Sequence, residues 1–155
     1  MLTILLLGAL AATPVATAED QANPQISWLT DLPQAKAQAR AEHKLVLMFF
    51  HGSDWCRDST QMQQEVFASR EFKTYAAANL VLVDIDFPER AHQPEALRRA
   101  NLALKQRFNL GEEWREGFPT VVVLDAKGNT LSQERGYRGE GVRPLIERIE
   151  RLKGN

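Results

Sequence analysis

Cys56 is the single cysteine of the 155-residue chain and lies between Trp55 and a segment with helical spacing. Three interpretations of this lone thiol are open: a working nucleophile, half of a redox pair whose second member is missing, or a small buried side chain. A cysteine in the first turn of a helix lies at the positive end of the helix dipole, beside backbone N–H groups without intrahelical partners. This environment favours the thiolate, which is the nucleophile of disulfide exchange.

Ser59 follows Cys56 by three residues and shares its face of the predicted helix, so its hydroxyl can donate a hydrogen bond to the thiolate. Arg57 adds positive charge nearby, whereas Asp54 and Asp58 oppose it. Serine cannot form a disulfide. A mixed disulfide on Cys56 would therefore wait for an external thiol.

The elements needed to position these residues follow the order βαβα and then ββα. Helices are predicted over 32–42, 56–68, 71–78, 95–108 and 142–152, and strands over 45–50, 80–87, 121–124 and 130–135. LVLMFF and LVLVDIDF are apolar runs typical of strands buried on both faces of a parallel sheet. DAKGN has the composition of a hairpin turn. We expect an α/β fold with a central mixed sheet flanked by helices.

Composition and charge exclude some partners. The net charge is −1, which gives no reason to expect a nucleic acid.

In the helix at 95–108, Leu97, Leu104 and Phe108 have the spacing of a packed side. The basic residues of this helix are interpreted as its solvent-exposed side: Arg98, Arg99, Lys105 and Arg107. His51, His92 and Cys56 lack the spacing of metal ligands, so we expect no metal site and no cofactor.

The first residues have the pattern of a secretory signal. We assign 1–18 to a signal peptide, 19–26 to a flexible leader and 27–155 to the folded domain. The apolar run from Leu2 to Ala12 is shorter than the roughly 20 residues that span a bilayer. We therefore expect an exported protein without a stable membrane anchor after cleavage, with the bacterial periplasm as its destination. One cysteine cannot close an intramolecular disulfide, so the fold depends on its hydrophobic core.

Several motifs in order resemble the thioredoxin superfamily, and most closely its exported branch of thiol:disulfide interchange type. They are GSDWC before the predicted helix, EVF within it, FNL at 108–110, GFPT at 117–120, LD at 124–125 with Gly128, and GY at 136–137. The resemblance covers about residues 27–153 and implies a thioredoxin-like fold. It also implies that Cys56 is the catalytic nucleophile, that the bond before Pro119 is cis, and that Phe118 presents its backbone to an extended substrate. The implied substrate-binding residues are Trp55, Phe118, Pro119 and Thr120.

The chain departs from the family pattern at two positions. Ser59 stands where the family has its second cysteine, so the motif is Cys-x-x-Ser. The strand before the motif lacks the acidic residue that many members bury as a proton acceptor, which leaves that role vacant or to water, His51 or Asp54. His51 is equally interpreted as the residue that ends the strand.

The implied function is thiol-disulfide exchange or isomerisation on extended protein substrates or low-molecular-weight thiols. Two alternatives stay open: a binding or chaperone module without redox turnover, and an engineered serine at position 59 of a dithiol oxidoreductase. Trp114 lies among charged residues in the loop at 111–117. This loop either borders the substrate groove or is a solvated loop with one anchoring aromatic residue.

Overall fold

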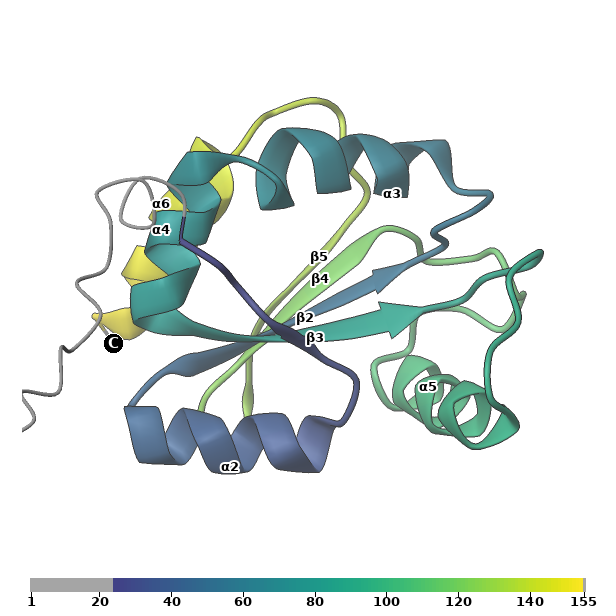
Figure 1. Ribbon diagram of the computed structural model, residues 1–155, viewed down its shortest axis with the longest axis horizontal. Coiled ribbons are helices and arrows are strands. Elements are labelled where there is room, and N and C mark those ends of the chain that lie inside the picture. The colour runs from purple at the N-terminus through teal and green to yellow at the C-terminus, as the bar shows by residue number, and fades with distance from the viewer. Residues whose placement is uncertain (1–23, 155) are drawn as a thin grey trace, which may run out of the picture.

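The computed structural model describes residues 24–154, which form a five-stranded sheet between two layers of helices (Figure 1). The strands are β1 (Trp28–Leu29), β2 (Leu45–His51), β3 (Leu80–Asp86), β4 (Thr120–Leu124) and β5 (Thr130–Arg135). The helices are α2 (Leu32–Glu42), α3 (Arg57–Met62), α4 (Arg70–Asn79), α5 (Glu95–Arg107) and α6 (Arg143–Lys153), with a π-helical turn at Gln63–Phe67. The predicted α/β class is confirmed. The proposed signal peptide lies outside the described residues.

The strand order is β1-β3-β2-β4-β5. β2 and β3 are parallel, with His51 opposite Asp86, and β4 is antiparallel to both β2 and β5. The parallel pair and the antiparallel hairpin are therefore as predicted. Since parallel strands end at the same edge, the segments after His51 and after Asp86 lie side by side. The sequence did not predict β1, a two-residue strand parallel to β3.

Alternate residues of β2 enter two separate hydrophobic clusters. Val46, Met48 and Phe50 belong to one cluster, which includes residues of α2. Leu47 and Phe49 belong to the other, which includes residues of the π-helical turn, α4 and α6. Figure 1 shows α2 and α5 on one side of the sheet and α3, α4 and α6 on the other. This arrangement follows from the period of two in a strand.

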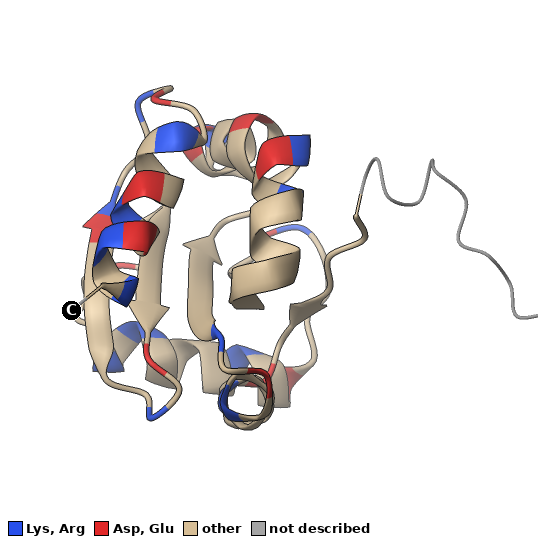
Figure 2. Ribbon diagram, turned by 90° about the vertical axis from the view of Figure 1, so that its left-hand side faces the viewer, with Lys and Arg blue, Asp and Glu red and all other residues tan. Residues whose placement is uncertain are grey.

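Charged residues lie mainly on helices and loops (Figure 2). Ile26, which the sequence assigned to the leader, packs against the second cluster, so ordered packing begins just before the expected domain boundary. No helix of the described part of the chain is long and apolar enough to cross a membrane.

Lys105 corrects the interpretation of α5. Arg98, Arg99 and Arg107 are exposed as expected, but Lys105 is only 3% exposed. Its Nζ donates hydrogen bonds to the carbonyl oxygens of Gly111 (2.6 Å) and Glu113 (2.9 Å). Burial lowers the pKa of this amine. The residue therefore ties α5 to the loop at 111–117, and an apolar spacing pattern could not reveal that long-range contact.

We expect Lys105→Met to lower the free energy of unfolding by about 1–3 kcal/mol, because two carbonyl oxygens lose a charged donor. Urea denaturation measures the difference. Arg107→Met, at an exposed position of the same helix, is the control and should change stability little. Equal stability of Lys105→Met and the natural protein would contradict this role.

Candidate active site

Cys56 is the N-cap residue of α3 rather than its first helical residue. Its carbonyl oxygen accepts a hydrogen bond from the N–H of Thr60 (3.1 Å), and its own N–H donates to Gly52 O (3.0 Å). The thiol makes no capping hydrogen bond and the residue is half-buried. The N–H groups of the first helical turn have no intrahelical acceptors. Cys56 therefore lies, half-buried, at the positive end of the helix dipole.

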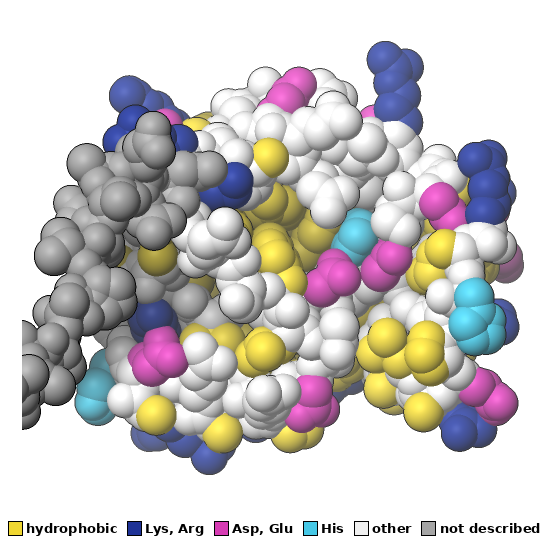
Figure 3. Space-filling model, in the orientation of Figure 1, with side chains coloured by type: hydrophobic (Ala, Val, Ile, Leu, Met, Phe, Trp, Pro, Cys, Tyr) yellow, Lys and Arg dark blue, Asp and Glu magenta, His cyan; other side chains and the backbone are white. Residues whose placement is uncertain are grey.

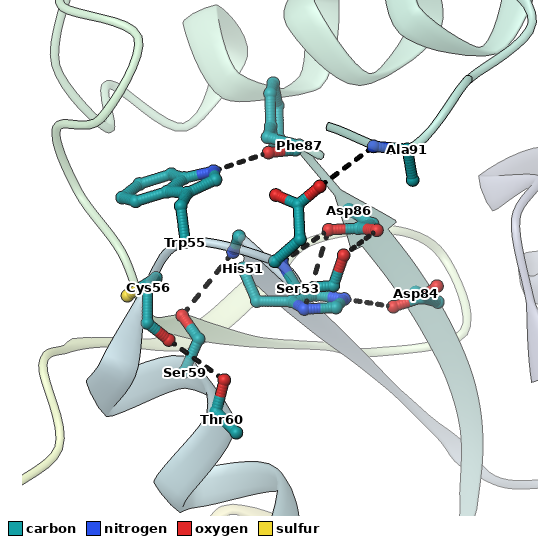
Figure 4. Close-up of polar contacts among 12 residues, drawn as sticks. His51, Ser53, Trp55, Cys56, Ser59, Thr60, Asp84, Asp86, Phe87 and Ala91 are labelled. Carbon is teal, nitrogen blue, oxygen red and sulfur yellow. Dashed lines mark hydrogen bonds and ion pairs between the residues drawn. The ribbon is translucent and has the colours of Figure 1, made fainter. Parts of the chain in front are cut away.

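Ser59 lies below this position and is 1% exposed. Its Oγ accepts a long hydrogen bond from the N–H of Gly52 (3.5 Å). Figure 4 shows the hydroxyl directed to this N–H, with the sulfur of Cys56 pointing away from it. No hydrogen bond joins Ser59 to the sulfur among the described residues, so the expected contact is replaced by one that supports the loop.

Trp55 is fixed beside Cys56 by contacts from three segments. Its Nε1 donates to Phe87 O (2.7 Å), as Figure 4 shows, and its ring meets that of Phe118 edge to face, with 5.7 Å between the centroids. A Cβ atom on Gly52 would lie 2.2 Å from the indole, so only glycine leaves room for the ring. The half-buried ring of Trp55, next in the chain to Cys56, is thus held between the Phe87 carbonyl and the Phe118 ring.

The segment around Pro119 offers backbone groups to a ligand. The peptide bond between Phe118 and Pro119 is cis. Within residues 24–154, neither the N–H nor the C=O of Phe118 has a hydrogen-bond partner. Pro119 O accepts from Gly136 N (2.8 Å). Thr120 is fully buried and its Oγ1 donates to Gly117 O (2.6 Å), so its side chain holds the loop instead of reaching a substrate as expected.

His51 is buried between β2 and β3, with 2% exposure. Its Nε2 lies 2.5 Å from Asp84 Oδ1, and its Nδ1 lies 3.7 Å from Asp86 Oδ1 (Figure 4). The ring stacks on Phe49 at 4.5 Å. Nδ1 has no hydrogen-bond partner in the described part of the chain. The imidazole therefore faces two carboxylates beneath the loop. His51 thus has specific polar contacts in addition to its position as the last residue of β2.

A hollow of about 320 Å³ lies beside this cluster. Trp28, Phe49 and Phe67 line it, with Lys73 and Asp84 at its polar positions. Figure 3 shows hydrophobic side chains in this region of the surface, next to acidic side chains and a histidine. Since the ring of His51 stacks on Phe49 and contacts Asp84, two residues of this hollow also hold the imidazole.

Asp54 is a structural residue of the loop. Its carboxylate accepts hydrogen bonds from the N–H groups of three consecutive residues, Glu89 (2.9 Å), Arg90 (2.7 Å) and Ala91 (2.9 Å). These bonds, that of Glu89 above all, hold the pKa of Asp54 below its usual value. A carboxylate engaged in this way is a poor proton carrier at neutral pH. The sequence-based expectation for Asp54 is therefore not supported by the geometry.

A sequence profile described as Thioredoxin-like matches residues 27–126. The chain belongs to the thioredoxin-like family. The disulfide bond reductase DsbH of Chlamydia pneumoniae is 34% identical over 117 residues, which are 76% of this chain and 67% of DsbH. The thioredoxin-related protein DsbJ of the same organism is 30% identical over 119 residues, which are 77% of this chain but 33% of DsbJ.

Solved structures agree with this assignment. A structure of the DsbH oxidoreductase has a TM-score of 0.75 and 30% identity, covering 92% of this chain and 94% of that one. A thioredoxin from Thermus thermophilus has a TM-score of 0.52 and 25% identity, covering 83% and 85%. The predicted family and fold are thus confirmed.

Residues of β3 and its end were not predicted as part of this thioredoxin-like site. Asp84 and Asp86 face His51, and Phe87 contacts both Trp55 and Phe118. The available signal was the pair of aspartates that interrupts the apolar run in LVLVDIDF. Two charges in a strand buried on both faces call for polar partners. Naming His51 as that partner required the strand register.

We expect Asp54→Ala to destabilise the protein at neutral pH, and this difference to shrink on acidification. Because folding lowers the pKa of Asp54, its contribution is present above the unfolded value of 3.8 and is lost as the pH falls through the folded value. Urea unfolding of both proteins across this range measures the effect.

Glu112→Ala is the control, because Glu112 is exposed and its carboxylate makes no hydrogen bond or ion pair within residues 24–154. A pH-independent difference between the natural protein and Asp54→Ala would contradict the assignment.

Proposed function

We propose that this chain carries out thiol-disulfide exchange or isomerisation through a single active thiol, Cys56. The observation that carries this proposal is that the half-buried Cys56 is the N-cap residue of α3, beside N–H groups that have no intrahelical acceptor. A disulfide bond reductase among the relatives supports the wider class of thiol-disulfide oxidoreductase. The substrates proposed are disulfides of extended protein segments or of low-molecular-weight thiols.

The exchange takes place in two steps. The Cys56 thiolate attacks one sulfur of the substrate disulfide, so a new S–S bond forms to Cys56 while the old S–S bond breaks. The second substrate sulfur leaves as a thiolate and takes a proton from solvent. A thiolate from the substrate or from a small thiol then attacks the mixed disulfide and releases Cys56. Ser59 cannot perform this second attack, so no net oxidation or reduction is completed by the chain alone.

The surroundings of the sulfur suit an extended ligand. The free N–H and C=O of Phe118 can pair with a substrate backbone in the manner of an added strand. The rings of Trp55 and Phe118 provide an apolar rim next to the thiol. Pro119 supports this segment through its carbonyl bond to Gly136.

We further propose that the protein is exported to a bacterial periplasm after removal of residues 1–18. The small-residue pattern Ala16-Thr17-Ala18 supports cleavage at that position. An oxidising compartment also supplies the disulfides on which the proposed reaction depends.

The decisive experiment follows the lifetime of a mixed disulfide by mass spectrometry, with 2-hydroxyethyl disulfide as the probe. We expect the natural chain to retain the adduct until an external thiol is added, and Cys56→Ala to form none. In Ser59→Cys the new thiol can displace the adduct and close a disulfide with Cys56. Its adduct lifetime should therefore be at least roughly tenfold shorter.

Cys56→Ala/Ser59→Cys is the matched control, since it keeps a thiol at the buried position 59 alone. Position 59 is 1% exposed, so this variant should form no adduct. Absence of any adduct on the natural Cys56 would contradict the proposed function and leave a binding module.

A further inference from the structure

A second pocket of about 440 Å³ lies on the α5 side of the candidate active site. It is lined by the loop at 88–94, including Glu89, Ala91 and His92, and by Arg98 and Trp114. Its volume is within the range of sites that hold small molecules or peptide side chains. None of these residues has a part in the exchange steps described above.

The pocket is joined to the active-site loop by direct contacts. Asp54 binds the N–H groups of Glu89, Arg90 and Ala91, and the bond to Ala91 is visible in Figure 4. The ring of Phe87, whose carbonyl oxygen accepts from Trp55, packs against Trp114 at 5.3 Å. A chain of ring contacts thus joins Trp55, the neighbour of Cys56, through Phe118 and the buried Phe87 to Trp114 at the wall of the pocket.

The charges of the pocket leave one cation without a partner. Glu89 is bound by Arg115 through two hydrogen bonds of 2.6 and 2.5 Å, which compensates its charge. The guanidinium of Arg98 lies 5.0 Å from the centroid of the Trp114 ring. No carboxylate pairs with Arg98 among residues 24–154, whereas its neighbour Arg99 is bound to Glu95 at 2.7 Å.

We propose that this pocket binds a carboxylate of the substrate that is joined to Cys56, with Arg98 as the recognition cation. A guanidinium binds carboxylates through two parallel hydrogen bonds, and the face of Trp114 can pack against the attached carbon chain. This inference rests on the proposed exchange function. The carboxylate comes either from an acidic side chain near the cysteine of a protein substrate or from a small thiol of the glutathione type.

The first test compares rates of mixed-disulfide formation on Cys56. The probes are oxidised glutathione, neutral 2-hydroxyethyl disulfide, and two peptide disulfides that differ only by Glu or Gln beside the cysteine. We expect Arg98→Gln to slow the anionic probes about 2- to 5-fold relative to their neutral counterparts, the range for a solvent-exposed ion pair. Arg99→Gln, one residue away and engaged with Glu95, should leave these ratios unchanged.

The two anionic probes, oxidised glutathione and the Glu peptide, distinguish the two sources of the carboxylate. A loss confined to glutathione identifies small thiols as the ligands, and a loss confined to the Glu peptide identifies acidic protein segments. Either result, or both together, supports the carboxylate pocket. Equal ratios in Arg98→Gln and the natural protein overturn it while leaving the exchange function intact.

A second test does not depend on thiol chemistry. S-methylglutathione and the S-methylated Glu peptide are titrated into Cys56→Ala, and the indole N–H signal of Trp114 is followed by NMR, with Trp114→Phe to assign it. We expect a saturable shift that is weakened by Arg98→Gln and not by Arg99→Gln. No shift with either ligand overturns the pocket, whereas a shift without any exchange on Cys56 contradicts the proposed function alone.

Discussion

The parallel pairing of β2 with β3 is the constraint on which the site depends. It sets His51 opposite Asp86 and brings the loop after β2 against the segment after β3. Three contacts then fix the Cys56 loop: Trp55 to the Phe87 carbonyl, Asp54 to the N–H groups at 89–91, and Ser53 to Asp86. A slip of one residue would exchange the faces of β2, placing Phe50 among the carboxylates and His51 in the apolar cluster. The thiol geometry is therefore a consequence of strand register.

The elements were predictable because their signals are local. Continuous apolar runs mark β2 and β3, and the Asp31 side chain caps α2 at the predicted start by accepting from Gln34 N. The candidate nucleophile also followed from its position before a helix. The partners of His51 and Lys105 did not, because each depends on contacts with residues that only the fold brings close. β1 was missed because two residues show no periodicity.

The polar support of the site comes from β3, a strand whose contribution to the site the sequence pattern did not indicate. The strand before the motif carries Phe50 on one face, fully buried among apolar residues, so no proton acceptor is available there. The opposite face holds His51 against Asp84, with Asp86 reaching both His51 and the Ser53 hydroxyl. The contact of Nε2 with Asp84 offsets part of the cost of burying the imidazole, since an isolated buried polar group costs of order 2–7 kcal/mol. The β3 aspartates thus couple the stability of the sheet edge to the shape of the loop.

A site with one thiol and a site with two thiols select their substrates at different steps of the exchange. With a second thiol, a wrongly captured substrate is released from within the protein. With Ser59 at that position, release depends on an external thiol, so discrimination falls on the first attack and on the non-covalent contacts that precede it. In the proposed exchange, those contacts would come from the rim of Trp55 and Phe118, the unpaired backbone groups of Phe118, and the pocket with Arg98. With serine at position 59, the proposed exchange therefore gives the surface around Cys56 a larger share in choosing the substrate.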